Sequence, residues 1–276
     1  MNKKTKATQA GGGSPPLLRH KQYGAPSVFA PENLLREARR QKAIPDGQIP
    51  KICALDPDGD IVRHLQATGQ ARLNPYWACY HTALYDFTWD GVDFGVVGCA
   101  VGAAFAVLVA EEMFASGCAL LISVTSSGQI SPAAQAPPFF VLIEKALRDE
   151  GASYHYLPPA DYAHLDARLG RLLDGAFPDL AQPVQRGATW TTDAPFRETA
   201  FAVAQAQAEG IVAVEMEAAA LYAFAQARRQ PVICFAHVTN QMGTVDNDFE
   251  KGHAGGAHDA LALIRATAGR WLLQEG

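Results

Sequence analysis

The stretch that decides the fold is residues 211–228, which read IVAVEMEAAALYAFAQAR. Residues 211–214 are apolar and mostly β-branched, as expected of a short buried strand. Residues 217–228 are rich in alanine and contain neither glycine nor proline, which favours a helix. A strand followed directly by a helix is the repeating unit of α/β proteins.

The rest of the chain continues this alternation. An Asp-Gly pair at residues 90–91 predicts a tight hairpin between strands 85–89 and 92–97. Further strands are predicted at 51–55, 118–124, 184–190 and 231–238, and helices at 33–42, 103–116, 139–150, 161–173, 197–209 and 258–273. The sequence therefore predicts an α/β fold, a three-layer α/β/α sandwich with a central mixed twisted sheet.

Composition narrows the class of protein. Hydrophobic residues make up 49% of the chain and charged residues 18%, which is enough apolar material for a large core. The net charge of -5 gives no basic patch for nucleic acid or an anionic membrane, so neither is expected as a partner. The five cysteines form no C-x-x-C pair, which indicates reduced thiols in a cytoplasmic protein and no zinc site.

The N-terminal residues and the apolar stretch at residues 94–110 indicate how the chain is organised into domains. We expect residues 1–26 to be a flexible tail and residues 27–276 to form a single domain. The early lysines precede glycine, serine and proline and no apolar h-region, so a signal peptide is not predicted. Residues 94–110 are apolar, but three glycines interrupt them and Glu111 and Glu112 follow, which favours a buried strand, turn and helix over a membrane span.

Two carboxylates stand at the predicted strand-to-helix junction, Glu215 and Glu217, on either side of Met216. Ligands of α/β sheets commonly bind at such junctions, and buried carboxylates are costly unless they bind something. A carboxylate can accept hydrogen bonds from both hydroxyls of a sugar. The alternative is a helix start at which acids face the positive end of the dipole.

The motif V-E-M-E-A-A-A-L-Y at residues 214–222 resembles the signature of the purine nucleoside and uridine phosphorylases and their nucleosidase relatives. The resemblance extends from residue 51 to the C-terminus. It implies the phosphorylase/hydrolase-like sandwich and a nucleoside pocket in which Met216 and Glu217 hold the ribose. Glu215 is assigned to the same substrate site.

Residues 58–63, DGDIVR, resemble the family's P-G-D-P-x-R phosphate loop without its prolines. The resemblance implies that the Gly59 backbone and the Arg63 guanidinium bind phosphate, a role that suits both groups. Asp58 adds a negative charge beside this anion site. The alternative is a surface turn with a solvated arginine.

Residues 123–128, SVTSSG, resemble the family's R-x-G-[ST]-x-G segment. Ser126 keeps the phosphate-binding hydroxyl, whereas Ser123 replaces the arginine and Thr125 the first glycine. Loss of one charged hydrogen bond costs about 1.5–3 kcal/mol, so phosphate affinity is expected to fall. The nucleosidases of the superfamily also lack this arginine and use water. The alternative is a polar strand end capped by hydroxyls.

Two further segments are assigned by resemblance. Residues 97–102, VGCAVG, resemble the small-residue loop that passes the ribose and phosphate, and Cys99 takes its threonine position. A catalytic role for the Cys99 thiol is not expected because no neighbouring base is evident. Residues 191–199 resemble the S-x-D-x-F segment, which makes Phe196 the ring that stacks on the base, while Asp193 fixes the loop.

Asn240 falls where the purine enzymes carry an aspartate that protonates the base. An amide cannot act as a general acid, so chemistry of that kind is disfavoured. Pyrimidine-specific members carry V-N-R-T here, and Asn240 matches their asparagine while Gln241 replaces their arginine. Both amides could read a base edge. The alternative is a polar loop after a buried strand.

The sequence thus predicts a phosphorylase that cleaves the N-glycosidic bond of a uridine-like nucleoside. Its co-substrate is inorganic phosphate, with no other cofactor and no metal, and its catalytic residues are Glu217, Asn240 and Arg63. A nucleosidase that uses water, a non-catalytic nucleoside-binding protein and a plain oligomeric scaffold are the alternatives. The resemblance also implies a homo-oligomer, a hexamer or a dimer, with a small-molecule nucleoside as its partner.

Overall fold

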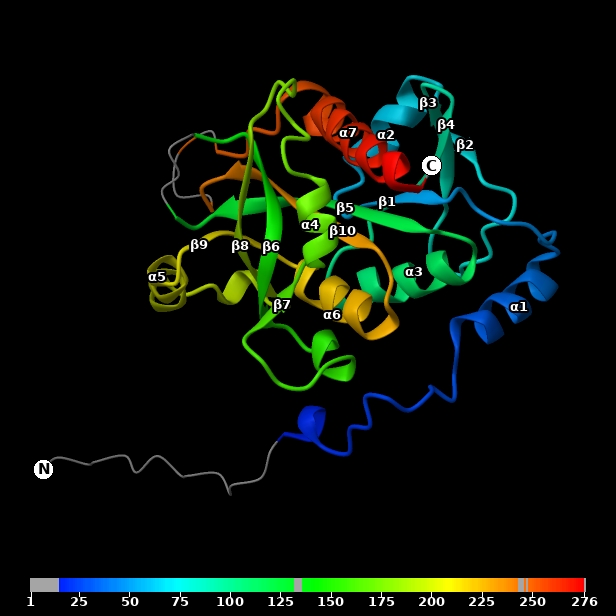
Figure 1. The fold of residues 1–276 in the computed structure, drawn as a ribbon, viewed down its shortest axis with the longest axis horizontal. Coiled ribbons are helices and arrows are strands. Elements are labelled where there is room, and N and C mark those ends of the chain that lie inside the picture. The colour runs from blue at the N-terminus through cyan, green and yellow to red at the C-terminus, as the bar shows by residue number, and fades with distance from the viewer. Residues whose placement is uncertain (1–14, 132–135, 243–245, 247, 276) are drawn as a thin grey trace, which may run out of the picture.

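The computed structural model describes residues 15–131, 136–242, 246 and 248–275. A ten-stranded mixed sheet runs through the molecule (Figure 1). The strands are β1 (Ile52–Asp56), β2 (Arg72–Leu73), β3 (Tyr85–Trp89), β4 (Val92–Gly98), β5 (Leu120–Gln129), β6 (Phe139–Asp149), β7 (Tyr162–His164), β8 (Val184–Thr192), β9 (Ile211–Glu215) and β10 (Val232–Asn240).

Helices connect most of these strands. The α-helices are α1 (Pro31–Lys42), α2 (Asp60–Ala67), α3 (Ala103–Ala115), α4 (Ala167–Leu172), α5 (Ala200–Ala208), α6 (Ala218–Arg228) and α7 (Ala257–Glu275). Short 3-10 helices are η1 (Pro16–Leu18), η2 (Ala152–His155), η3 (Pro195–Arg197) and η4 (His253–Gly256).

The strand order is β10-β6-β8-β9-β5-β1-β4-β3-β2, with β7 paired to β6. Strand β10 also pairs with β5, so β5, β10, β6, β8 and β9 close into a ring. Strand β5 lies parallel to β1 and β10 but antiparallel to β9, which makes the sheet mixed. The carboxyl ends of β1, β5 and β10 therefore meet at one edge, where α/β sheets place ligands.

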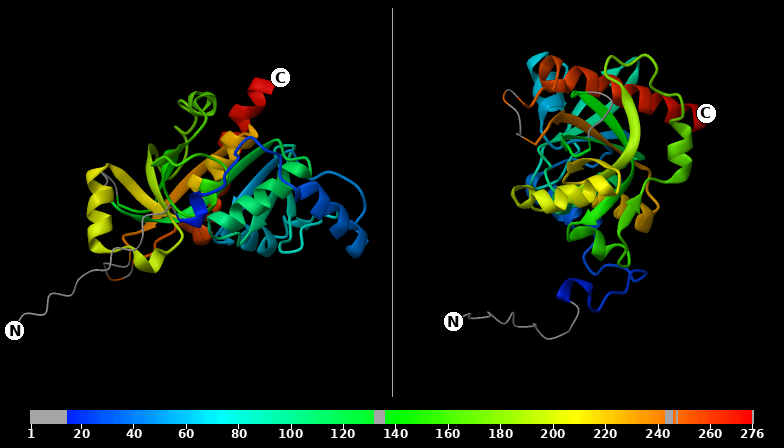
Figure 2. Two further views of the ribbon diagram at one scale, coloured as in Figure 1. Left: turned by 90° about the horizontal axis from the view of Figure 1, so that it is seen from below. Right: turned by 90° about the vertical axis from the view of Figure 1, so that its left-hand side faces the viewer.

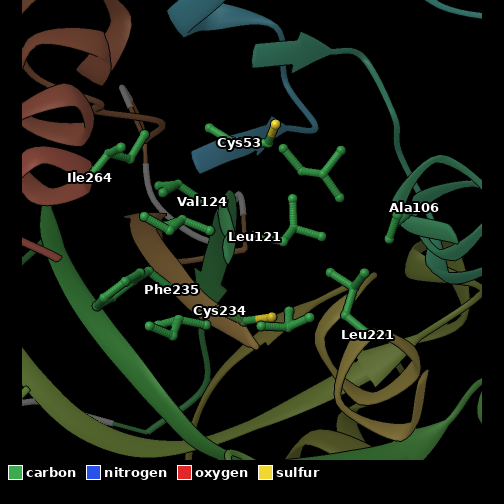
Figure 3. Packing of buried hydrophobic residues seen from close by; sticks show 14 of the residues in the cluster. Cys53, Ala106, Leu121, Val124, Leu221, Cys234, Phe235 and Ile264 are labelled. Atoms are coloured by element: carbon green, nitrogen blue, oxygen red, sulfur yellow. The ribbon is translucent and has the colours of Figure 1, made fainter. Parts of the chain in front are cut away.

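Helices cover both faces of the strands β1, β5 and β10. Helices α2 and α7 pack together on one side, and α3 and α6 pack together on the other (Figure 1). Ile264 of α7 lies on one side of Val124 and Leu121 of β5, while Ala106 and Leu221 lie on the other (Figure 3). Helices α1 and α5 lie at opposite ends of the molecule (Figure 2). The predicted α/β fold with a central mixed sheet is confirmed.

The predicted hairpin and the apolar stretch after it are confirmed. Asp90 and Gly91 have φ of 50° and 77°, the positive values that a tight hairpin turn requires. Residues 94–110 become most of β4, a turn and the first half of α3. Within the described part of the chain, no helix is both long and apolar enough to cross a membrane.

The prediction of a helix at residues 139–150 is wrong, because this segment is the strand β6. Its first five residues are buried, and it pairs with β10 on one side and β8 on the other. The run FFVLI is rich in aromatic and β-branched residues, which suit a strand covered on both faces. A short apolar run does not by itself separate a buried strand from a buried helix.

Two other predicted helices are shorter than expected. Residues 161–173 contain β7 and then α4, which begins only after Asp166 accepts hydrogen bonds from the N–H groups of Arg168 and Leu169. Residues 197–209 contain the end of η3 and α5, which begins after the Thr199 hydroxyl accepts from Ala202 N–H. In both cases a side-chain cap sets the first helical residue.

The predicted flexible tail is only partly described. Residues 1–14 lie outside the described residues. In residues 15–26, η1 is present and Lys21 Nζ lies 2.7 Å from His155 Nδ1. The division at residue 26 stays a prediction.

Candidate functional site

Glu217 lies at the end of β9, just before α6, and only 1% of it is exposed. Its Oε1 accepts a hydrogen bond from the Gly102 N–H at 2.7 Å. Gly102 has a φ of 88° and a ψ of 148°, a conformation essentially restricted to glycine. The carboxyl group thus joins the start of α6 to the loop that precedes α3.

The environment of Glu217 favours its protonated form. Burial, and then the charge of Glu215, raise the pKa of Glu217 to about 8. The Gly102 N–H and the side chain of Thr125 act in the opposite direction but do not outweigh burial. The carboxyl group therefore carries a proton at neutral pH. It releases this proton only when hydrogen-bond donors approach and stabilise the ionised form.

Glu215, assigned to the substrate site from the sequence, has a full set of internal partners. Its Oε1 accepts from the hydroxyls of Thr189 at 3.0 Å and Thr191 at 2.5 Å. Its Oε2 accepts from the N–H groups of Glu217 and Ala218, both at 2.7 Å. The structure therefore uses Glu215 to fix the start of α6 and to position Glu217.

Met216 lies between these two acids and is half-buried. Its N–H donates to Glu217 Oε2 at 3.3 Å, so both oxygens of Glu217 accept a backbone hydrogen bond. The role of Met216 against a ribose stays a prediction.

The predicted phosphate loop is organised by Asp56 at the end of β1. Asp56 Oδ1 accepts from the Gly59 N–H at 3.1 Å, and Oδ2 accepts from the Val62 N–H at 3.0 Å. Burial is the main reason that the pKa of Asp56 rises to about 7. The Gly59 N–H also donates to the Asp56 carbonyl at 2.9 Å, so this predicted phosphate donor already has partners.

Arg63 lies on α2 with 60% of its side chain exposed. Its Nη2 donates to Asp60 Oδ1 at 2.6 Å and to the Asp58 carbonyl at 2.8 Å. Lys251, far along the chain, donates from Nζ to Asp60 Oδ2 at 2.6 Å. Burial acts to raise the pKa of Asp60, but the hydrogen bonds from Lys251 and Arg63 lower it below its usual value.

Cys99 lies beside this loop. Its side chain is exposed, its φ is 63°, and its N–H donates to the Asp56 carbonyl at 2.9 Å. A Cβ at Gly59 would lie 2.7 Å from Cys99 Sγ and 2.8 Å from Arg63 Nη1. The structure thus brings Gly59, Arg63 and Cys99 together, and glycine at 59 is required both by this close approach and by its φ of 77°.

Ser126 lies near the carboxyl end of β5. The residue before it, Thr125, has a side-chain hydrogen bond that acts to lower the pKa of Glu217. Successive side chains of a strand point to opposite faces. Ser126 accordingly meets a different partner, Asp58, to which it donates two hydrogen bonds. Two neighbouring residues of β5 therefore contact the two predicted parts of the site, Thr125 the ribose ligand Glu217 and Ser126 the phosphate loop through Asp58.

The residues predicted to face the base have different surroundings. Asn240 is buried, and its Oδ1 accepts from the Met242 N–H at 2.8 Å while its Nδ2 donates to the Ser127 carbonyl at 3.3 Å. The exposed Gln241 donates its N–H to Asp248 at 2.8 Å. Phe196 lies on η3 and is 98% exposed. Their contacts with a base stay predictions.

Three features of the site were not predicted from the sequence. Lys251 carries no motif, and 191 residues separate it from Asp60. The role of Asp58 as the partner of Ser126 is equally non-local. The alternating threonines of β8 that hold Glu215 could have been found, because a period of two places Thr189 and Thr191 on one face of a strand.

A cavity of about 510 Å³ lies between residues 22–34 and the helices α3 and α6, but no predicted site residue lines it. A much smaller one, of about 20 Å³, borders Asp58, Ser126 and Lys251. The described residues contain no group of histidine, cysteine, aspartate and glutamate side chains that could hold a metal ion.

Solved structures of nucleoside phosphorylases and of a nucleosidase are similar to this chain. Uridine phosphorylase from Vibrio fischeri has a TM-score of 0.68 at 19% identity, covering 82% of this chain and 93% of its own. Purine nucleoside phosphorylase from Toxoplasma gondii has a TM-score of 0.69 at 14% identity, with 83% and 93% covered. A 5'-methylthioadenosine/S-adenosyl homocysteine nucleosidase from Campylobacter jejuni has a TM-score of 0.63 at 15% identity, with 79% and 97% covered.

Identities this low show that the fold is shared and leave the substrate open. No curated protein matches the sequence. The sequence profile of the phosphorylase superfamily does match, over residues 53–268, which is most of the chain. The matched region includes Glu217, Arg63 and Ser126 and extends from β1 into α7. The chain therefore belongs to the phosphorylase superfamily, which includes nucleoside phosphorylases and nucleosidases.

Proposed function

We propose that this protein cleaves the N-glycosidic bond of a nucleoside. One observation carries the proposal: Glu217 is buried at a strand-to-helix junction, and its two oxygens are held by the N–H groups of Gly102 and Met216. A buried acid fixed in this way is costly unless it serves a ligand. The two vicinal hydroxyls of a ribose supply the donors that such a carboxylate can accept.

Binding and proton loss are coupled in this scheme. The pKa of Glu217, raised to about 8 by burial and by the nearby charge of Glu215, falls when two hydroxyl groups donate to the ionised form. The carboxylate then fixes the sugar relative to the attacking group and the base. Holding the reacting atoms in this geometry converts binding energy into rate.

The base is proposed to be a pyrimidine. Asn240 stands where a purine-specific enzyme would need a proton donor, and an amide has no proton to give at neutral pH. The similar structure from Vibrio fischeri is a uridine phosphorylase. Because the Asn240 amide already bonds Met242 and Ser127, base recognition at this position requires either an exchange of partners or contacts from the neighbouring backbone.

Inorganic phosphate and water are the two candidate acceptors of the sugar. Phosphorolysis, the expectation from the sequence, would use inorganic phosphate held by Gly59, Arg63 and Ser126 and would give ribose 1-phosphate. Each of these residues has an internal hydrogen-bond partner, which favours the second candidate, hydrolysis by water.

The experiment that tests the proposal is base release from a panel of purine and pyrimidine nucleosides, followed by absorbance with and without phosphate. Glu217→Gln keeps the size of the side chain but cannot become an anion, and we expect it to lower kcat/KM at least about a hundredfold. Glu32→Gln, an exposed acid on α1, is the matched control and should keep full activity. If the parent protein cleaves no nucleoside, or Glu217→Gln is as active as the control, the proposal is wrong.

A further inference from the structure

We propose that Asp58 acts as a built-in anion that occupies the oxyanion position at Ser126, excludes phosphate and makes water the acceptor of the sugar. The inference rests on the proposed nucleoside cleavage and names the residue that determines its second substrate. Four observations support it, and they concern hydrogen bonds, charge, space and the loop that carries Asp58.

The first observation is the contact itself. The Ser126 N–H donates to Asp58 Oδ2 at 2.8 Å, and the Ser126 hydroxyl donates to Asp58 Oδ1 at 2.9 Å. A backbone N–H and a hydroxyl on one residue form the kind of paired donor that binds two oxygens of an oxyanion. Here the two oxygens belong to a side chain of the same protein.

The second observation is charge. Lys251 Nζ lies 2.6 Å from Asp60 Oδ2 and 3.8 Å from Asp58 Oδ1, while Arg63 bonds Asp60 at 2.6 Å. Two cations thus face two carboxylates, so the charges of these four side chains cancel before any ligand binds. An incoming phosphate would add negative charge beside Asp58 and Asp60, where like charges repel.

The third observation is space. The cavity that borders Asp58, Ser126 and Lys251 has a volume of about 20 Å³. A cavity needs roughly 10–15 Å³ to hold one water molecule. This volume accommodates a water molecule beside Asp58, and the Asp58 carboxylate takes the place that phosphate oxygens would need at Ser126.

The fourth observation is that the loop holds Asp58 in place. Asp56 anchors the turn through the N–H groups of Gly59 and Val62, and Arg63 Nη2 holds the Asp58 carbonyl at 2.8 Å. Displacement of Asp58 by phosphate would therefore break the two Ser126 hydrogen bonds and leave Lys251, 3.8 Å from Oδ1, as the nearest charged partner of the carboxylate. The arrangement favours a permanently occupied position.

The reaction that follows is balanced with water alone. The bond between C1′ and the base nitrogen breaks, and the water oxygen forms the new bond to C1′. One water proton ends on the departing base and the other stays in the new hydroxyl, so the products are the free base and ribose.

A binding experiment tests the role of Asp58 without any turnover. Calorimetric titration with inorganic phosphate should show no binding by the parent protein up to about 10 mM, whereas Asp58→Ala should bind at least about tenfold more tightly. The Asp58→Ala/Ser126→Ala double variant should lose this binding. Asp46→Ala, which removes an exposed aspartate elsewhere, is the charge-matched control and should behave as the parent does.

The result that overturns the inference is phosphate binding by the parent protein that matches Asp58→Ala, or an Asp58→Ala variant that folds and still binds none. If Asp58→Ala does not fold, Asp58→Ser replaces it. This variant removes the charge and shortens the side chain, and it should bind phosphate measurably.

Product analysis separates this inference from the proposed function. With a nucleoside that the parent cleaves, we expect free ribose and a rate independent of phosphate, while Asp58→Ala should form ribose 1-phosphate in phosphate buffer. Ribose 1-phosphate from the parent would overturn the inference. If no nucleoside is cleaved at all, the proposed function fails, and the calorimetric result still decides whether Asp58 excludes phosphate.

Discussion

Glu217 accepts a hydrogen bond from the Gly102 N–H at 2.7 Å, although 115 residues separate the two along the chain. This bond ties the junction of β9 and α6 to the loop before α3. It also leaves the carboxyl group buried and its pKa raised, by burial first and by Glu215 second, to about 8. The proposed function depends on this one group, and several measurable consequences follow from its surroundings.

Nucleoside binding should depend on pH through Glu217. Below about pH 8 the carboxyl group must release a proton before it can accept two hydroxyls, so affinity should rise by up to about tenfold per pH unit and level off above that value. Calorimetry in buffers of different ionisation enthalpy should detect the released proton. The Glu217→Gln variant should bind weakly, with a flat pH profile; an equal pH dependence in this variant would assign the titration to another group.

The same raised pKa should be visible in the stability of the unliganded protein. A carboxyl group whose folded pKa lies above its unfolded value of about 4.5 destabilises the fold as the pH rises from 4.5 towards 8. We therefore expect Glu217→Gln to be more stable than the parent at pH 8 and similar to it near pH 4. Urea denaturation at both pH values measures this difference. A variant that is less stable at pH 8 would contradict it.

Gly102→Ala should disturb the site through the backbone. A Cβ at this position meets no atom within 4 Å, so the cost comes from its φ of 88° and should be about 1–3 kcal/mol of unfolding free energy. If the loop relaxes, the Gly102 N–H turns away from Glu217 and kcat/KM falls as well. Gly269→Ala is the control, because it lies inside α7 with equally open space and should stabilise that helix by about 0.5–1 kcal/mol.

Glu215→Ala should be strongly destabilising. Four donors lose their acceptor: the hydroxyls of Thr189 and Thr191 and the N–H groups of Glu217 and Ala218. Buried donors without partners cost about 1–3 kcal/mol each, and partial relaxation should leave a total near 3 kcal/mol or more. Chemical denaturation measures the loss. A change below about 1 kcal/mol would show that Glu215 does not hold the start of α6.

The Tyr222→Phe variant should lower the stability of the fold and leave the catalytic rate unchanged. The fully buried hydroxyl donates to the Ile143 carbonyl at 2.6 Å and accepts from the Cys234 N–H at 3.1 Å, which ties α6 to β6 and β10. Its removal should cost about 1–3 kcal/mol, seen as a lower Tm, because both backbone groups stay buried. The kcat at low temperature should not change. A large loss of kcat in a folded variant would place Tyr222 in the chemistry.

Local signals explain what the sequence could predict of the fold. The hairpin depends on two adjacent residues, Asp90 and Gly91, and the junction at 211–228 on a change of composition within one segment. The strand β6 could not be recognised in this way. Its helix-like pattern is overruled by pairing with β8 and β10, and these pairings form only in the folded chain.

The same distinction, between local signals in the sequence and contacts that form only on folding, applies to the candidate site. The motif around Glu217 and the spacing of Gly59 and Arg63 are contiguous in sequence, and the structure places Glu217 between β9 and α6, Gly59 between β1 and α2, and Arg63 on α2. The partners are not contiguous: Ser126 meets Asp58 across 68 residues, and Lys251 meets Asp60 across 191. A local motif predicts which groups are present, but only the fold shows that Asp58 accepts two hydrogen bonds from Ser126, the predicted phosphate ligand.

A double-mutant cycle between protein and ligand tests whether Glu217 holds the vicinal hydroxyls of the sugar. Binding of a ribonucleoside and of its 2′,3′-dideoxy analogue would be measured by calorimetry for the parent protein and for Glu217→Gln. Loss of the hydroxyls should weaken binding to the parent at least about a hundredfold and to Glu217→Gln by less than about threefold. An equal loss in both proteins would show that these hydroxyls do not contact Glu217.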